Sequence, residues 1–189
     1  MNKERLVAFT DAVLAIIMTI LVLELEKPEH ISWQGFWDLR MNFLAYTISF
    51  FWLGTMWVNM HHSWDSVKQI NNKLVWISIL LLFFASFFPY VTSIVASDFY
   101  NPVGQAVYGI VVLLVTFTNV WMYDELAKMP IHHDEDQKII VSHNDKVMAL
   151  DIIIKVIGLL LTLTLLPSAM MWSVFITALV LIIPRSIKD

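Results

Sequence analysis

Six apolar segments, each approaching the ~20 residues that an α-helix needs to cross ~30 Å of hydrocarbon, constrain this chain to a membrane fold. They span residues 6–25, 40–60, 74–95, 103–123, 147–166 and 168–183. Strands of a membrane β-barrel would be about half as long and would alternate in polarity. We therefore predict an all-α, polytopic membrane protein in which residues 1–189 form one domain with six transmembrane helices per subunit. The fifth and sixth helices, separated only by Pro167, should form a tight hairpin.

Composition and charge exclude several other classes of protein. The chain is 58% hydrophobic, more than a soluble domain of 189 residues could bury. Its formal net charge of −4 provides no basic surface for nucleic acid, so we expect membrane lipids and no nucleic acid as partners. The absence of cysteines excludes disulfides and thiolate chemistry.

The distribution of lysine and arginine predicts the orientation. Nine lie on the side of the amino terminus, the second and fourth loops and the tail: Lys3, Arg5, Lys68, Lys73, Lys128, Lys138, Lys146, Arg185 and Lys188. Only Lys27 and Arg40 lie on the other side. The positive-inside rule then places both termini in the cytoplasm. A cleaved signal peptide is the less favoured reading of the first segment, because Asp11 enters its apolar run and Glu24 follows it.

Charged residues at the start of the first segment form the most informative motif. Arg5 and Asp11 lie in the run Arg-Leu-Val-Ala-Phe-Thr-Asp, directly before an apolar stretch. Charges near hydrocarbon are costly and usually face protein or a water-filled path, so they indicate a functional region. The two residues are six apart, which is not a contacting spacing on a helix, so each needs a partner on another helix. We expect a polar cluster with residues near the same end of the second and third helices: Asn59, His61 and Asn72. The alternative is that this cluster only fixes helix packing.

One line along the first helix contains mainly apolar residues. At 100° per residue, Asp11 lies well off this line, which is formed by Arg5, Phe9, Ala12, Ile16, Thr19, Ile20 and Leu23. Taken alone, such a line is more typical of a buried packing seam than of a pore.

The motif Arg5-x-x-x-Phe9-Thr10-Asp11 resembles the Arg-x-x-x-Phe-Ser/Thr-Asp signature of the endosomal and lysosomal potassium channels (the transmembrane protein 175 family), and in particular their bacterial members. The similarity continues in Ala15-Ile16-x-x-Thr19-Ile20-Leu21-x-Leu23-Glu24 and in Trp57-x-x-x-His61-His62. Further matches are Asn72-x-Leu74 and Phe88-Pro89, and the six predicted helices cover essentially the whole chain in the manner of the family. Thr10 replaces the commoner serine and keeps the hydroxyl.

The resemblance implies a potassium-permeable cation channel in the plasma membrane of a prokaryote, assembled as a homotetramer. It also implies that the first helix lines the pore, with Ile16 at the narrowest ring, Ile20 and Leu23 in the next apolar rings, and Thr19 near the path. The chain has no Thr-Val-Gly-Tyr-Gly run, so selection would rest on side chains and a hydrophobic gate rather than on backbone carbonyls. We expect no enzymatic activity, no cofactor and no metal site, only permeant potassium and other monovalent cations.

Three further groups have two readings each. Asp151 and Lys155 are spaced i,i+4 on the fifth helix, and a structural ion pair is favoured over an ion-binding element. Glu24 either concentrates cations at the pore entrance or is a solvated helix end. In the fourth loop, a solvated segment is favoured over a metal site, because the acidic and histidine residues are consecutive: His132, His133, Asp134, Glu135 and Asp136.

A proton-permeable channel or a secondary cation transporter is the alternative function. A transporter would favour charged residues at mid-membrane depth and broken or repeated helices. A membrane enzyme would need a convergent catalytic set, for which only the adjacent histidines His61 and His62 are candidates.

Overall fold

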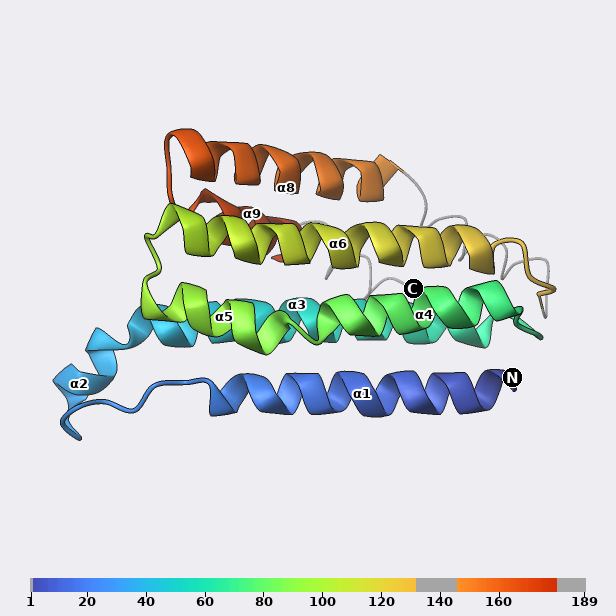
Figure 1. The fold of residues 1–189 in the computed structure, drawn as a ribbon, viewed down its shortest axis with the longest axis horizontal. Coiled ribbons are helices and arrows are strands. Elements are labelled where there is room, and N and C mark those ends of the chain that lie inside the picture. The colour runs from blue at the N-terminus through green and yellow to red at the C-terminus, as the bar shows by residue number, and fades with distance from the viewer. Residues whose placement is uncertain (1, 132–145, 180–189) are drawn as a thin grey trace.

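The structure is a computed structural model that describes residues 2–131 and 146–179. Its long helices run up and down along one axis, with α1 at one edge of the bundle and α8 at the opposite edge (Figure 1). The elements are α1 (Lys3–Leu23), α2 (Trp33–Asp38), α3 (Arg40–Asp65), α4 (Asn72–Ala85), α5 (Phe88–Ser97), α6 (Pro102–Leu126), α8 (Lys146–Thr164) and α9 (Ala169–Thr177). The predicted all-α class is confirmed. The short helix α2 was not predicted, because six residues are too few to show a helical period.

Local sequence signals set most helix ends. The Asn71 side chain accepts a hydrogen bond from the backbone N–H of Leu74 at 2.7 Å and so caps α4. Asn101 caps α6 in the same way, and Pro102 follows at the first helical position, where its missing N–H costs nothing.

The third predicted helix is divided into α4 and α5. Pro89 cannot donate a hydrogen bond to the carbonyl of Ala85, so the helix is interrupted at Ser86 and Phe87. The prediction of one continuous helix over residues 74–95 is corrected in this respect. Among the described residues, three stretches are long and apolar enough to cross a membrane: Lys3–Leu23, Asn72–Ser97 and Pro102–Leu126.

The centre of the bundle holds aromatic rings and buried hydroxyl groups. The rings of Trp52 and Phe88 stack at 4.9 Å, and Phe88 meets Tyr108 edge-on. Ser49 contacts the hydroxyl of Tyr108 at 3.2 Å and accepts a hydrogen bond from Thr92 at 2.9 Å. These contacts join α3, α5 and α6, and they satisfy polar groups that would otherwise be costly to bury.

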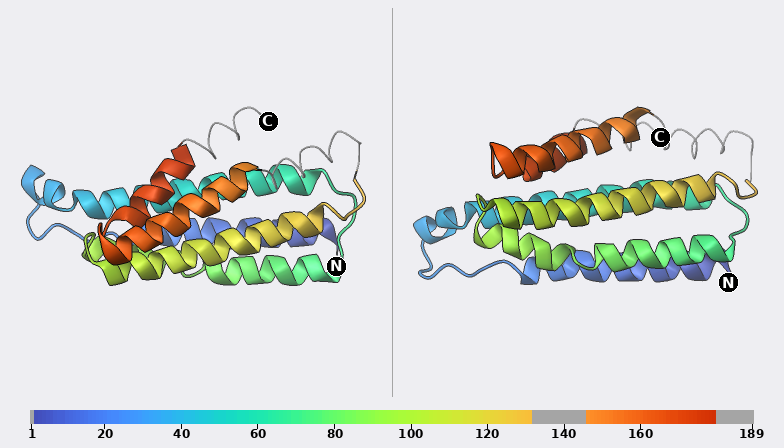
Figure 2. Two further views of the ribbon diagram at one scale, coloured as in Figure 1. Left: turned by 90° about the horizontal axis from the view of Figure 1, so that it is seen from above. Right: turned by 45° about the horizontal axis from the view of Figure 1, so that its top comes forward.

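The predicted hairpin is formed by α8 and α9, which lie together on one side of the bundle (Figure 2). The hydroxyl of Thr162 accepts a hydrogen bond from the backbone N–H of Met170 at 2.8 Å. Gly158 permits the close approach, because a Cβ at this position would collide with the side chain of Ser173. The end of the sixth predicted span, beyond residue 179, lies outside the described residues.

Candidate functional site

Helix α1 is the least covered of the three long apolar stretches. Only 28% of its apolar window is buried, compared with 50% for Asn72–Ser97 and for Pro102–Leu126. One face packs against α3, α4 and α5, and its buried residues are Leu6, Thr10, Leu14, Ile17 and Leu21. Because the opposite face is apolar and open, α1 has room for a further packing partner or for a path along its surface.

The line predicted from the helical period is the open face of α1. All seven of its members are exposed: Arg5, Phe9, Ala12, Ile16, Thr19, Ile20 and Leu23. Ile16 is 57% exposed, whereas its neighbour Ile17 is 4% exposed. The Thr19 hydroxyl donates to the carbonyl oxygen of Ile16 at 2.8 Å, so its proton is used within its own helix. Within one subunit this line is therefore not a buried packing seam.

Asp11 is held by a tryptophan of α3. The indole Nε1 of Trp57 donates to the Asp11 carboxylate at 2.8 Å, and the Trp57 ring stacks on His61 at 5.7 Å. His61 Nε2 in turn lies 3.6 Å from the Asp65 carboxylate. A chain of polar contacts thus runs from α1 along the end of α3.

The structure gives Asp11 a hydrogen-bond partner, Trp57, that is not among the three expected ones. Within residues 2–131 and 146–179, neither Asn59, His61 nor Asn72 hydrogen-bonds with Asp11, and Arg5 is exposed and forms no ion pair there. The reason is register. Asp11 lies eight residues into α1 and Trp57 lies eight residues before α3 ends, so the two are level in an antiparallel pair. His61 lies four residues further along, or about 6 Å nearer the end of the bundle.

Two other residues of the motif have local roles in the structure. Thr10 is buried, and its hydroxyl donates to the carbonyl of Leu6 at 2.9 Å, within its own helix. Phe9 is 53% exposed on the open face. Glu24 is exposed at the C-cap of α1, at the end of the helix opposite to Arg5.

A groove between α1 and α3 was not predicted from the sequence. It has a volume of about 430 Å³, and its lining is apolar apart from Asp11 at one end and Thr19: Asp11, Leu14, Ala15, Met18, Thr19, Phe50 and Trp57. The signal for Trp57 was available, since it lies one turn before His61 and so on the same helical face.

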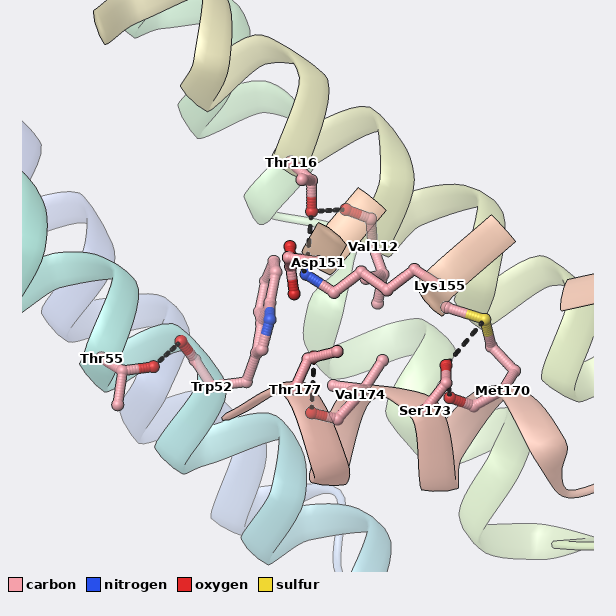
Figure 3. Close-up of polar contacts among 10 residues, drawn as sticks. All are labelled: Trp52, Thr55, Val112, Thr116, Asp151, Lys155, Met170, Ser173, Val174 and Thr177. Carbon is pink, nitrogen blue, oxygen red and sulfur yellow. Dashed lines mark hydrogen bonds and ion pairs between the residues drawn. The ribbon is translucent and has the colours of Figure 1, made fainter. Parts of the chain in front are cut away.

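A second charged site is buried between α3, α6 and α8 (Figure 3). Lys155 Nζ lies 2.6 Å from the Asp151 carboxylate and 3.3 Å from the hydroxyl of Thr116, and it lies over the Trp52 ring at 5.1 Å. Lys155 is 1% exposed and Asp151 is 5% exposed. The predicted pair is confirmed, and its enclosure supports the structural reading. The histidine and acidic run at positions 132–136 lies outside the described residues.

Comparison with known proteins gives one family match and several relatives. Residues 5–89 match the model of the endosomal/lysosomal potassium channel TMEM175. A potassium channel of Chryseobacterium sp. (strain P1-3) is 40% identical over 120 residues, which is 62% of each chain. A potassium channel of Streptomyces collinus is 30% identical over 134 residues, or 65% of each chain. A potassium channel of Chamaesiphon minutus is 30% identical over 134 residues, which is 65% of this chain and 66% of the relative. The matched part thus spans just under two thirds of these relatives' lengths.

The fold has a close counterpart among solved structures. The crystal structure of a lysosomal potassium-selective channel TMEM175 homolog from Chamaesiphon minutus superposes with a TM-score of 0.79. The match covers 98% of this chain and 97% of that chain at 22% sequence identity. The architecture of the whole described bundle is therefore that of this structure. The relatives are named as channels rather than as enzymes, which agrees with the expectation that this chain is not an enzyme.

Proposed function

Because residues 5–89 match the model of the endosomal/lysosomal potassium channel TMEM175 and relatives at 30–40% identity are potassium channels, we propose that this chain belongs to that family and forms a potassium-permeable cation pore in a membrane. The observation that supports this most directly is the open apolar face of α1. That face includes Ile16, Ile20 and Leu23 and remains exposed although the opposite face of the same helix is packed.

A single copy of α1 cannot surround a path, so the proposed pore requires several subunits. We propose a homotetramer in which four α1 helices face a common axis. The groove between α1 and α3 then receives an apolar surface of the neighbouring subunit, because its lining is apolar except for Asp11 and Thr19. Small and apolar surfaces of this kind pack well between helices in lipid.

The proposed conduction path narrows at stacked apolar rings. Ile16 and Ile20 are about 6 Å apart along the helix, and Leu23 lies about 4.5 Å further, so each ring is about one turn from the next. An apolar ring narrower than a hydrated ion forces the ion to lose water, and it empties of water when it closes. Selection between potassium and sodium then depends on ring size and dehydration cost, with Glu24 concentrating cations at the entrance.

We place the protein in the plasma membrane of a prokaryote, with both termini in the cytoplasm. Lys3, Lys68, Lys73 and Lys128 lie at the same end of the bundle, which supports this orientation. An impermeant thiol reagent applied to intact cells tests it in this cysteine-free chain. We expect labelling of Ser97→Cys and protection of Gln69→Cys, two positions that are both exposed. The reverse pattern contradicts the orientation.

A secondary cation transporter is the competing function, and the buried pair Lys155–Asp151 is the observation that favours it, since charged groups inside the membrane often mark transport sites. A pore remains the better proposal, because this pair is enclosed whereas the α1 face is open. Single-channel recording of the purified protein in planar bilayers separates the two. Discrete potassium current steps support the pore, and saturable exchange without steps supports the transporter.

A further inference from the structure

A second groove lies on the outer surface of the bundle, between α4 and α6. It has a volume of about 420 Å³ and an almost entirely apolar lining: Lys73, Trp76, Ile77, Ile79, Leu80, Phe83 and Trp121. Trp76 is 71% exposed, and Ile79 and Phe83 are 40% and 54% exposed. Positions 76, 79, 80 and 83 form one stripe at helical spacing, so the groove runs along α4 rather than across it.

One end of this groove is cationic. Lys73 Nζ lies 2.7 Å from the Glu125 carboxylate and 5.9 Å from the centre of the Trp121 ring, with its side chain half exposed. Lys128 lies 3.2 Å from the same carboxylate, and Asn71 donates to it at 2.7 Å. Two ammonium groups therefore share one buried carboxylate, which leaves one positive charge of this cluster to interact with an anion at the mouth of the groove.

The dimensions of the groove fit one leaflet of a bilayer. From Lys73 to Phe83 the helix rises about 15 Å, which is half of the ~30 Å hydrocarbon thickness. The two exposed tryptophans, Trp76 and Trp121, lie near the charged end, as is usual for rings at the level of the lipid headgroups. A second protein helix would extend over both leaflets, whereas an acyl chain ends near the midplane.

We propose that the α4–α6 groove binds an anionic phospholipid from the leaflet at this end of the bundle, with one acyl chain along Trp76, Ile79 and Phe83 and the phosphate at Lys73. Lys73 provides the charge complementarity, and Lys128 and Asn71 continue to hold Glu125 when the ammonium of Lys73 turns toward the phosphate. This site lies on α4 and α6, apart from the open face of α1, and its occupation does not depend on conduction.

Native mass spectrometry of the purified full-length protein tests the preference. With equimolar dioleoyl phosphatidylglycerol and dioleoyl phosphatidylcholine, we expect the anionic lipid to be retained about five-fold more, which corresponds to about 1 kcal/mol for one lysine at the membrane surface. Lys73→Gln should reduce this ratio to about one, and Lys73→Arg should keep it. Lys68→Gln is the matched control, because Lys68 is exposed at the same end of the bundle but does not line the groove.

A photo-cross-linker identifies the occupant without disturbing the charged cluster. With p-benzoylphenylalanine in place of Ile79, irradiation in phosphatidylglycerol vesicles should add the mass of one lipid to the chain. This cross-linking experiment identifies the molecule in the groove even if Lys73→Gln fails to fold. Cross-linking to a second copy of the chain overturns the proposal. So do equal retention of both lipids by the parent, a reduction of the retention ratio in Lys68→Gln as large as in Lys73→Gln, and displacement of the lipid by inorganic phosphate alone.

Discussion

Replacing Ile16 and Ile17 by asparagine, one at a time, separates a path-lining position from a packing position with the same chemical change. The two residues are adjacent on α1, but their side chains lie about 100° apart around the helix. Ile16 is 57% exposed on the open face, and Ile17 is 4% exposed against the rest of the bundle. The structure therefore predicts opposite consequences for stability and for conduction.

The exposed fractions of the two side chains determine how much each substitution should change the free energy of unfolding. Ile17→Asn removes packed methyl groups and buries an amide without a designed partner, so we expect the free energy of unfolding to fall by about 2–5 kcal/mol. Ile16→Asn changes an open position, for which surface substitutions typically alter stability by less than about 0.5 kcal/mol. At the proposed constriction, four amides hydrate a ring that four isoleucines keep dry. If this lowers the barrier by about 1–2 kcal/mol, conductance rises about five- to thirty-fold.

Thermal unfolding in detergent measures the stability change, and planar-bilayer recording under bi-ionic potassium and sodium conditions measures conductance and reversal potential. We expect Ile16→Asn to raise the current and move the potassium/sodium permeability ratio toward one, with an unfolding temperature close to that of the parent. Unchanged current and selectivity in Ile16→Asn, together with a shifted reversal potential in a folded Ile17→Asn, would refute the assignment of the open face to the pore. If neither variant changes conduction, α1 does not line the path.

Three further predictions address contacts and assembly. Trp57→Phe removes the hydrogen bond to Asp11 and keeps an aromatic ring beside His61, so we expect the free energy of unfolding to fall by about 1 kcal/mol. Adding Asp11→Asn to this variant should not lower the free energy further, and additive losses in a thermal-unfolding cycle would contradict the contact. Lys155→Met leaves the buried carboxylate of Asp151 without its partner and should lower the free energy of unfolding by about 3–5 kcal/mol. Adding Asp151→Leu should recover most of this stability, and a double variant as unstable as the single one would argue against a structural pair. Native mass spectrometry in mild detergent should detect four copies of the chain, and a monomer that still conducts would exclude the tetrameric pore.

In the charged network at the amino-terminal end of the bundle, the sequence predicts which residues need partners but not which partners they find. The sequence places Asp11 near the start of the first helix and shows that it needs a partner. Its partner Trp57 depends on the relative height of α1 and α3, which follows from the packing of both helices and from the linker with α2 between them. The groove at Lys73 and the carboxylate of Glu125 likewise depend on two helices that are far apart in the chain.

The sequence by itself determined the all-α membrane class, the tight C-terminal hairpin, the pair Lys155–Asp151 and which residues share one line along α1. These features are local, because apolar length, the 3.6-residue period and i,i+4 spacing are all set within one helix. Only the tertiary structure decided which residue holds Asp11, that the line along α1 stays open, and which grooves remain on the surface. The physical reason is that the register between helices is set by side-chain packing over the whole bundle, and a displacement of one turn changes every partner.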